Sequence, residues 1–229
     1  MTLVERIQNL KQSTNRWTTR NSHDPASVRL VIVTKTVPPE MIRSAYNAGE
    51  RDFGENRVQE WREKKEELPT DIRWHLIGHL QTNKVKYVVG QVHLIHSLDR
   101  LELADEIERQ AQKKGIHEVP CLLQVNMSGE ETKSGMDPDQ VSRFAAAMAN
   151  RPSIKVKGLM TIGPFTEDET RIRECFRATR RLFESLKTEQ RSHAWEILSM
   201  GMSADYKIAI EEGANMLRIG SLIFPRNLK

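Results

Sequence analysis

The chain is poor in cysteine and has no long apolar run. Its 229 residues include two cysteines, Cys121 and Cys175, whose spacing fits neither a metal site nor a CxxC redox pair. Both fall in apolar or helical patterns, so we expect reduced thiols in the core. No apolar run approaches the roughly 18 residues that a membrane span needs. The N-terminal segment MTLVERIQNLKQ also lacks the apolar centre of a secretory signal, and we therefore predict a cytoplasmic protein with no membrane partner.

Blocks of like charge are missing too. Lys and Arg number 35 against 31 Asp and Glu, so the chain is only mildly basic. Both signs are mixed within the two most charged segments, WREKKEE (61–67) and RIRECFRATRRLFES (171–185). Mixed charges of this kind are typical of helix faces in contact with water. We therefore expect these segments to be solvated and predict no nucleic-acid partner.

What the chain does have is a regular alternation of short apolar runs with helical patterns. The expected strands span 29–34, 51–53, 73–77, 93–96, 121–126, 155–160, 196–199 and 216–219. The expected helices span 3–17, 39–48, 56–67, 80–88, 99–114, 138–149, 167–187 and 203–212, with Asp99 as the expected cap of its helix. Alternation indicates parallel βα units. The pattern predicts an α/β fold, a single-domain (β/α)8 TIM-type barrel over 1–229 with an extra N-terminal helix.

Polar and glycine-rich clusters follow the expected strands. Lys35 follows the first strand and Gly54-Glu55-Asn56 the second, while SMGMS (199–203) ends the seventh and RIGS (218–221) the eighth. The carboxyl ends of barrel strands meet on one face, which carries the active site. Loops after strands seven and eight frequently bind phosphate there, so we predict an anion site, although a tight turn explains either string alone.

The histidines divide into two groups. His75 alternates with core residues and is expected to lie in the interior, whereas His79 follows Gly78 beyond the third strand and is a candidate for the pocket. His93 and His96 have no carboxylate or cysteine at a ligand spacing, so no metal site is predicted.

Lys35 is unusual because a buried-strand pattern ends on an amine. The strand either surfaces there or presents a reactive group, since lysine is seldom buried. Desolvation and nearby cations lower the pKa of a lysine, which can then form a Schiff base with an aldehyde. With a phosphate site across the rim and the permanent cation of Arg218, Lys35 predicts a pocket for a phosphorylated aldehyde such as pyridoxal 5′-phosphate (PLP).

Five segments closely resemble the pyridoxal phosphate homeostasis protein family: VIVTKTVP, RDFGENRVQE, WHLIGHLQTNK, LSMGMSADYKIAI and MLRIGS. Members look like the isolated N-terminal barrel of alanine racemase, and the match covers about 28 to 224. The resemblance implies that Lys35 forms the Schiff base, that Asn56 lies near the cofactor and that Arg218 faces the pyridine nitrogen. The glycine-bearing segments would contact the phosphate. The expected cofactor-binding residues are Lys35, Asn56, His79, Ser199, Met200, Gly201, Ser203, Arg218, Gly220 and Ser221.

The chain departs from the family pattern at two positions. Ser221 stands where threonine is usual, which keeps a hydroxyl. Pro225 stands where glycine is usual, and proline has no backbone N–H to offer a phosphate.

The resemblance favours a protein that carries or buffers PLP without substrate turnover. An arginine stays protonated and leaves the pyridine nitrogen unprotonated, which makes the cofactor a weaker electron sink. PLP-dependent client enzymes are the expected protein partners, and the expected lack of a dimer-forming domain favours a monomer. A PLP-dependent amino-acid racemase is the main alternative, but Tyr46, Tyr87 and Tyr206 all fall in helical patterns. A class I aldolase is the other, but Lys155 and Lys157 lie in the first half of strand six.

Overall fold

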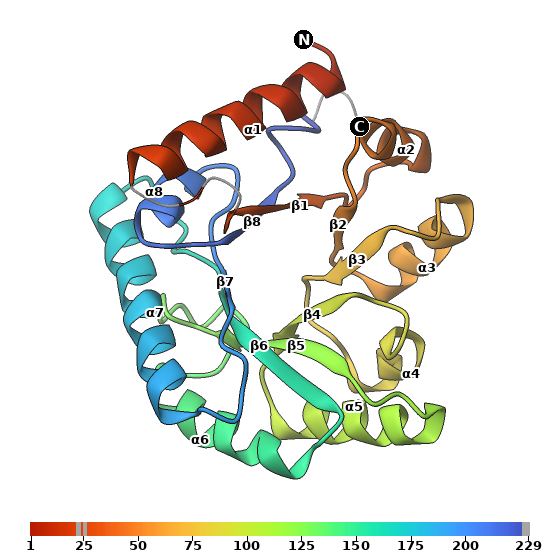
Figure 1. Cartoon of the computed structure of the whole chain (residues 1–229), viewed down its shortest axis with the longest axis vertical. Coiled ribbons are helices and arrows are strands. Elements are labelled where there is room, and N and C mark those ends of the chain that lie inside the picture. Colours follow the sequence, from red (N-terminus) through yellow and green to blue (C-terminus); the bar gives the residue numbers. More distant parts are fainter. Residues whose placement is uncertain (22–23, 25–26, 226–229) are drawn as a thin grey trace.

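The computed structural model describes residues 1–21, 24 and 27–225, and in them eight parallel strands close into a barrel in chain order (Figure 1). The barrel closes where β1 pairs with β8, with Val31 opposite Arg218 and Ile32 opposite Ile219. The predicted (β/α)8 fold is confirmed. The strands are β1 (Arg29–Val33), β2 (Asp52–Glu55), β3 (Arg73–Leu76), β4 (Leu94–Leu98), β5 (Val119–Val125), β6 (Ile154–Thr161), β7 (Ile197–Ser199) and β8 (Met216–Ile219).

The helices form a ring outside the strands, as Figure 1 shows. They are α1 (Leu3–Arg20), α2 (Pro39–Asn47), α3 (Val58–Glu67), α4 (Val85–Val88), α5 (Leu101–Lys114), α6 (Val141–Ala147), α7 (Glu169–Glu189) and α8 (Tyr206–Glu211), with 3-10 turns η2 (Thr82–Lys84), η3 (Pro138–Gln140) and η4 (Met148–Asn150). The extra helix α1 lies beside α8, where the Ser13 and Tyr206 hydroxyls are 2.9 Å apart. Among the described residues, no helix has the length and hydrophobicity that crossing a bilayer requires.

Two local expectations are wrong. The helix expected over 80–88 is a 3-10 turn followed by one short α-helical turn, and Gly90 at φ 77° follows it. Asp99 does not cap α5, because Arg100 occupies the N-cap position and makes no side-chain capping bond. The Asp99 carboxylate instead accepts a hydrogen bond from the Arg100 guanidinium at 2.7 Å. A charged neighbour thus competes successfully for the carboxylate.

Apolar residues fill two separate regions. The larger core lies between strands and helices, and a smaller cluster of Val31, Leu94, Leu122, Met160 and Met216 packs inside the barrel. Both cysteines are buried free thiols, as predicted. Burial raises the pKa of both, that of Cys175 to about 11.

Candidate functional site

Lys35 lies in the turn just beyond β1, two residues after the last strand residue. Its side chain is exposed, while the preceding Thr34 is fully buried. Among the described residues its ammonium has no hydrogen bond or ion pair. The strand therefore does surface here, as one interpretation held, and it delivers an available amine to the carboxyl rim of the barrel.

The turn after β8 lies directly against the end of β1. A Cβ placed on Gly220 would be 3.2 Å from both Cβ and the carbonyl oxygen of Val33, so the two backbones approach closely. Gly220 also accepts N–H bonds from Ile223 and Phe224, at 3.0 and 2.8 Å. Ser221 is exposed beside it. The rim of β8 is thus tightly turned and adjacent to the segment that carries Lys35.

The segment after β7 makes a second tight turn. Gly201 has φ 93°, and a Cβ on it would lie 2.5 Å from the Cβ of Ala209 on α8. The buried Asp205 accepts the Met202 N–H at 2.5 Å, and burial raises the pKa of its carboxyl. Ser203 is half-buried in the same turn. Only glycine fits at position 201, because any side chain would clash with Ala209 and the positive φ disfavours other residues.

Arg218 is buried at 4% exposure inside the barrel. Its guanidinium donates to the Ser199 hydroxyl at 2.7 Å and to the Thr161 carbonyl at 2.8 Å. Burial lowers the pKa of Arg218 to about 10, although the charge of Asp205 opposes the shift. The guanidinium therefore keeps its positive charge at neutral pH, as the sequence argument required.

A chain of buried polar groups continues from Arg218 through the barrel. Ser199 Oγ lies 3.3 Å from His96 Nδ1, His96 Nε2 lies 2.9 Å from His75 Nδ1, and His75 Nε2 lies 3.0 Å from Asp52 Oδ1. Burial lowers the pKa of both histidines. His75 is thus an interior histidine, as predicted, and it is His96 that connects it to the arginine.

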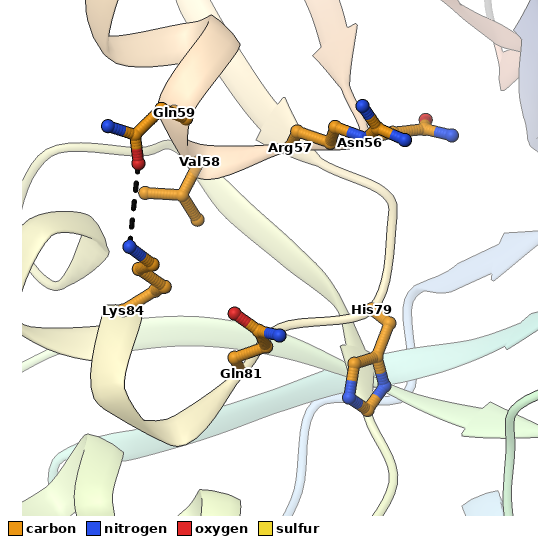
Figure 2. A pocket seen from close by; sticks show the side chains of 7 residues that line it. All are labelled: Asn56, Arg57, Val58, Gln59, His79, Gln81 and Lys84. Carbon is orange, nitrogen blue, oxygen red and sulfur yellow. Dashed lines mark hydrogen bonds between the residues drawn. The ribbon is translucent and has the colours of Figure 1, made fainter.

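Asn56 and His79 line one pocket of about 290 Å³ at the carboxyl ends of β2 and β3 (Figure 2). Asn56 is half-buried and His79 is half exposed, with its Nδ1 4.0 Å from Asp99. Arg57, Val58, Gln59, Gln81 and Lys84 complete the lining. A Cβ on Gly78 would overlap the Asn56 carbonyl, so glycine is what lets the loop bearing His79 lie against Asn56.

Two expected residues have surroundings that the sequence did not indicate. The Ser199 hydroxyl is fully buried and is hydrogen-bonded to Arg218 and His96. Met200 is fully buried, and its N–H donates to the Met216 carbonyl at 3.2 Å. Neither lies among the exposed groups at the mouth of the barrel.

A charged cluster that the sequence did not indicate contacts the Thr34 carbonyl, in the peptide next to Lys35. WREKKEE was expected to be solvated, but Lys64 within it is 6% exposed and points inward. Its ammonium is bonded to Glu55 and Glu60, and to the Thr34 carbonyl. The expectation of a solvated side chain is wrong at Lys64, because the two carboxylates accept the hydrogen bonds of the ammonium in place of water.

Comparison with known proteins decides the family. Residues 8–226 match the family described as "Alanine racemase, N-terminal domain". A pyridoxal phosphate homeostasis protein from Aquifex aeolicus is 45% identical over 225 residues, covering 98% of each chain, and one from Helicobacter pylori is 42% identical over 202 residues, covering 86% of this chain and 87% of the relative. The chain belongs to the pyridoxal phosphate homeostasis protein family.

Solved structures support the same family. PipY of Synechococcus elongatus, solved with PLP bound, is 34% identical with a TM-score of 0.85, covering 97% of this chain and 100% of PipY. The form without PLP gives a TM-score of 0.89 at 34% identity and the same coverage. Alanine racemase from Clostridium difficile is 15% identical, with a TM-score of 0.71 and coverage of 93% of this chain and 55% of the racemase. This last likeness shows the shared barrel fold alone.

The residues on the rim fit PLP, whose functional groups are an aldehyde, a phosphate and a pyridine nitrogen. Lys35 offers an exposed amine for the aldehyde. Two tight glycine turns, each with a serine hydroxyl, offer small donors for a phosphate. Arg218 offers a buried cation inside the barrel. These residues therefore have the kinds of groups that an aldehyde, a phosphate and a pyridine nitrogen would require.

Proposed function

We propose that the protein holds PLP on Lys35 and carries or buffers it in the cell without turning over a substrate. The observation that supports this most is the junction of β1 and β8, where the Gly220 backbone lies against Val33, two residues before Lys35, and where Val31 pairs with the buried Arg218. PLP supplies an electrophilic aldehyde carbon and an aromatic ring that can accept electrons. The residues of this chain would attach it, orient it and limit that electron withdrawal.

Attachment requires the neutral amine of Lys35. Lys35 would hold PLP through this nitrogen, and the bound aldehyde would supply the electrophilic carbon for a covalent link formed with loss of one water. Gly201 and Gly220 allow the backbone to approach the phosphate closely, and the Ser203 and Ser221 hydroxyls can donate to it. Pro225 has no backbone N–H, so it cannot offer an amide donor to this site.

Holding rather than turnover is favoured by the surroundings of Arg218 and by the tyrosines. A charged guanidinium disfavours protonation of a nearby pyridine nitrogen, so carbanions would gain little stabilisation. The Tyr206 hydroxyl is bonded to Ser13, and the Tyr46 hydroxyl to Asp71 at 2.6 Å. Tyr87 lies on α4 under the Arg62 guanidinium. None of the three lies among the rim residues named above. We further propose transfer of PLP to client enzymes by a cytoplasmic monomer.

The test is to load the purified protein with PLP, record the absorbance band of the Schiff base, reduce with borohydride and locate the tag by mass spectrometry. The tag is expected on Lys35, and Lys35→Ala is expected to lose the band. Lys86→Ala is the matched control, since Lys86 is an exposed lysine on α4 that does not line the pocket of Asn56 and His79, and it should keep the band. A tag on another lysine, or no band with excess PLP, would contradict the proposal. Racemisation assays on a panel of amino acids then separate a carrier from a racemase.

A further inference from the structure

Lys64 is a buried lysine for which the proposed function has no direct use. It lies on α3, and its side chain is 8% exposed. Its ammonium donates to the Thr34 carbonyl at 2.7 Å, to Glu55 Oε1 at 2.7 Å and to Glu60 Oε1 at 2.5 Å. An ammonium has three N–H donors, so all of them have protein acceptors.

These acceptors hold the backbone on both sides of Lys35. The Thr34 carbonyl belongs to the peptide that precedes Lys35. The peptide that follows is held by Glu60, whose Oε1 accepts the Thr36 N–H at 2.5 Å. The Thr34 hydroxyl also donates to Glu55 Oε1, at 2.6 Å. One charged cluster thus fixes both peptide planes between which Lys35 projects.

The turn that this cluster holds is a conformationally unusual one. Thr36 has φ 59°, the one positive φ outside glycine in the described part of the chain. A β-branched residue avoids this region because its side chain crowds the backbone. The turn therefore needs outside support to persist, and the bond from Thr36 N–H to Glu60 supplies it.

We propose that Lys64 is a positioning residue for Lys35. With Glu55 and Glu60 it fixes the turn after β1, so that the Lys35 amine points at the rim beside β8 instead of sampling many directions. Pre-organisation of this kind favours reaction of the amine with a bound aldehyde, and leaves binding of the phosphate and ring unchanged. The inference rests on the proposed function, since it concerns how readily Lys35 forms the Schiff base.

The test separates Schiff-base formation from non-covalent binding. PLP reports the first by absorbance, and pyridoxine 5′-phosphate, which has no aldehyde, reports the second by isothermal titration. Lys64→Met should weaken Schiff-base formation by at least about tenfold, the effect of losing one hydrogen bond to a charged group. The dissociation constant for pyridoxine 5′-phosphate should stay within about twofold. Lys65→Met is the matched control, because that ammonium bonds Gln91 at the surface, and it should change neither value.

Two variants of Glu60 keep the test decisive if Lys64→Met does not fold. Glu60 is partly exposed, so changes there are tolerated better. Glu60→Gln keeps an oxygen for the Thr36 N–H and should retain Schiff-base formation within about threefold, whereas Glu60→Leu should lose about tenfold. Equal losses for both ligands, or no loss at all, would overturn the positioning role. Failure of the unmodified protein to form the Schiff base would instead contradict the proposed function.

Discussion

The buried histidine His96 makes a quantitative prediction about stability at acidic pH. Its ring has no exposed surface and lies between His75 and Ser199 inside the barrel. Burial, together with the nearby charges of His75, Arg218 and His93, places the pKa of His96 well below its usual value. Folding therefore requires the neutral ring, while the unfolded chain is free to protonate it.

The sign and size of the effect follow from proton linkage. Because the folded pKa is lowered, the unfolded state binds more protons below pH 6.5, and stability falls as the pH falls. For one histidine that has an unfolded pKa of about 6.5 and stays neutral in the folded protein down to pH 5, this linkage costs little at pH 7 and about 2 kcal/mol at pH 5. His96 alone should thus cost the fold about 2 kcal/mol between these two pH values. His75 acts in the same direction, but its bond to Asp52 opposes the shift.

Buried carboxyl groups act in the opposite direction, so the total pH dependence does not isolate His96. Burial raises the pKa values of Glu55 and Asp205, and such groups make the folded state more stable as the pH falls. These contributions cancel when the pH dependence of the unfolding free energy is compared between the unmodified protein and a variant that lacks His96. His96→Gln keeps amide groups near His75 and Ser199 but does not titrate.

The assay is urea unfolding of both proteins at pH 7 and pH 5. The free energy of unfolding of the unmodified protein should fall by about 2 kcal/mol more than that of His96→Gln over this range. His117→Gln, which removes an exposed histidine, is the control and should behave like the unmodified protein. An equal loss in His96→Gln and the unmodified protein would refute the argument that the buried ring stays neutral.

Two further substitutions test the geometry of the rim. Gly78→Ala would place a Cβ onto the Asn56 carbonyl. We therefore expect the free energy of unfolding in urea to fall by about 1–3 kcal/mol and PLP to bind more weakly. Unchanged affinity for PLP would contradict a role for this contact in the site. Arg218→Ala leaves Ser199 and the Thr161 carbonyl without their donor, and should weaken PLP retention about tenfold or more in a titration and shift the absorbance maximum. An unchanged absorbance spectrum would show that Arg218 does not interact with bound PLP.

The barrel could be predicted from the sequence because buried parallel strands appear as short apolar runs, and each expected strand exists within a few residues. The ends of elements were less predictable, since they depend on contacts between distant residues. The expected helix start at Asp99 shows this, because its carboxylate binds Arg100 instead of the helix N–H groups. Lys35 and Arg218 stand out in the sequence for a different reason, because each is a charged residue at the end of an apolar run.

Lys64 shows where a sequence signal existed but could not be interpreted. Val58, Trp61 and Lys64 are all buried, and Leu68 just beyond α3 is buried as well. Their spacing of three, three and four residues is that of the core-facing side of a helix. Lys64 thus occupies a core position, and a lysine there predicts either an unstable helix or a buried partner for the charge. The partners come from β2, from the Thr34 carbonyl and from the same helix one turn earlier, and only the folded barrel brings them together beneath Lys35.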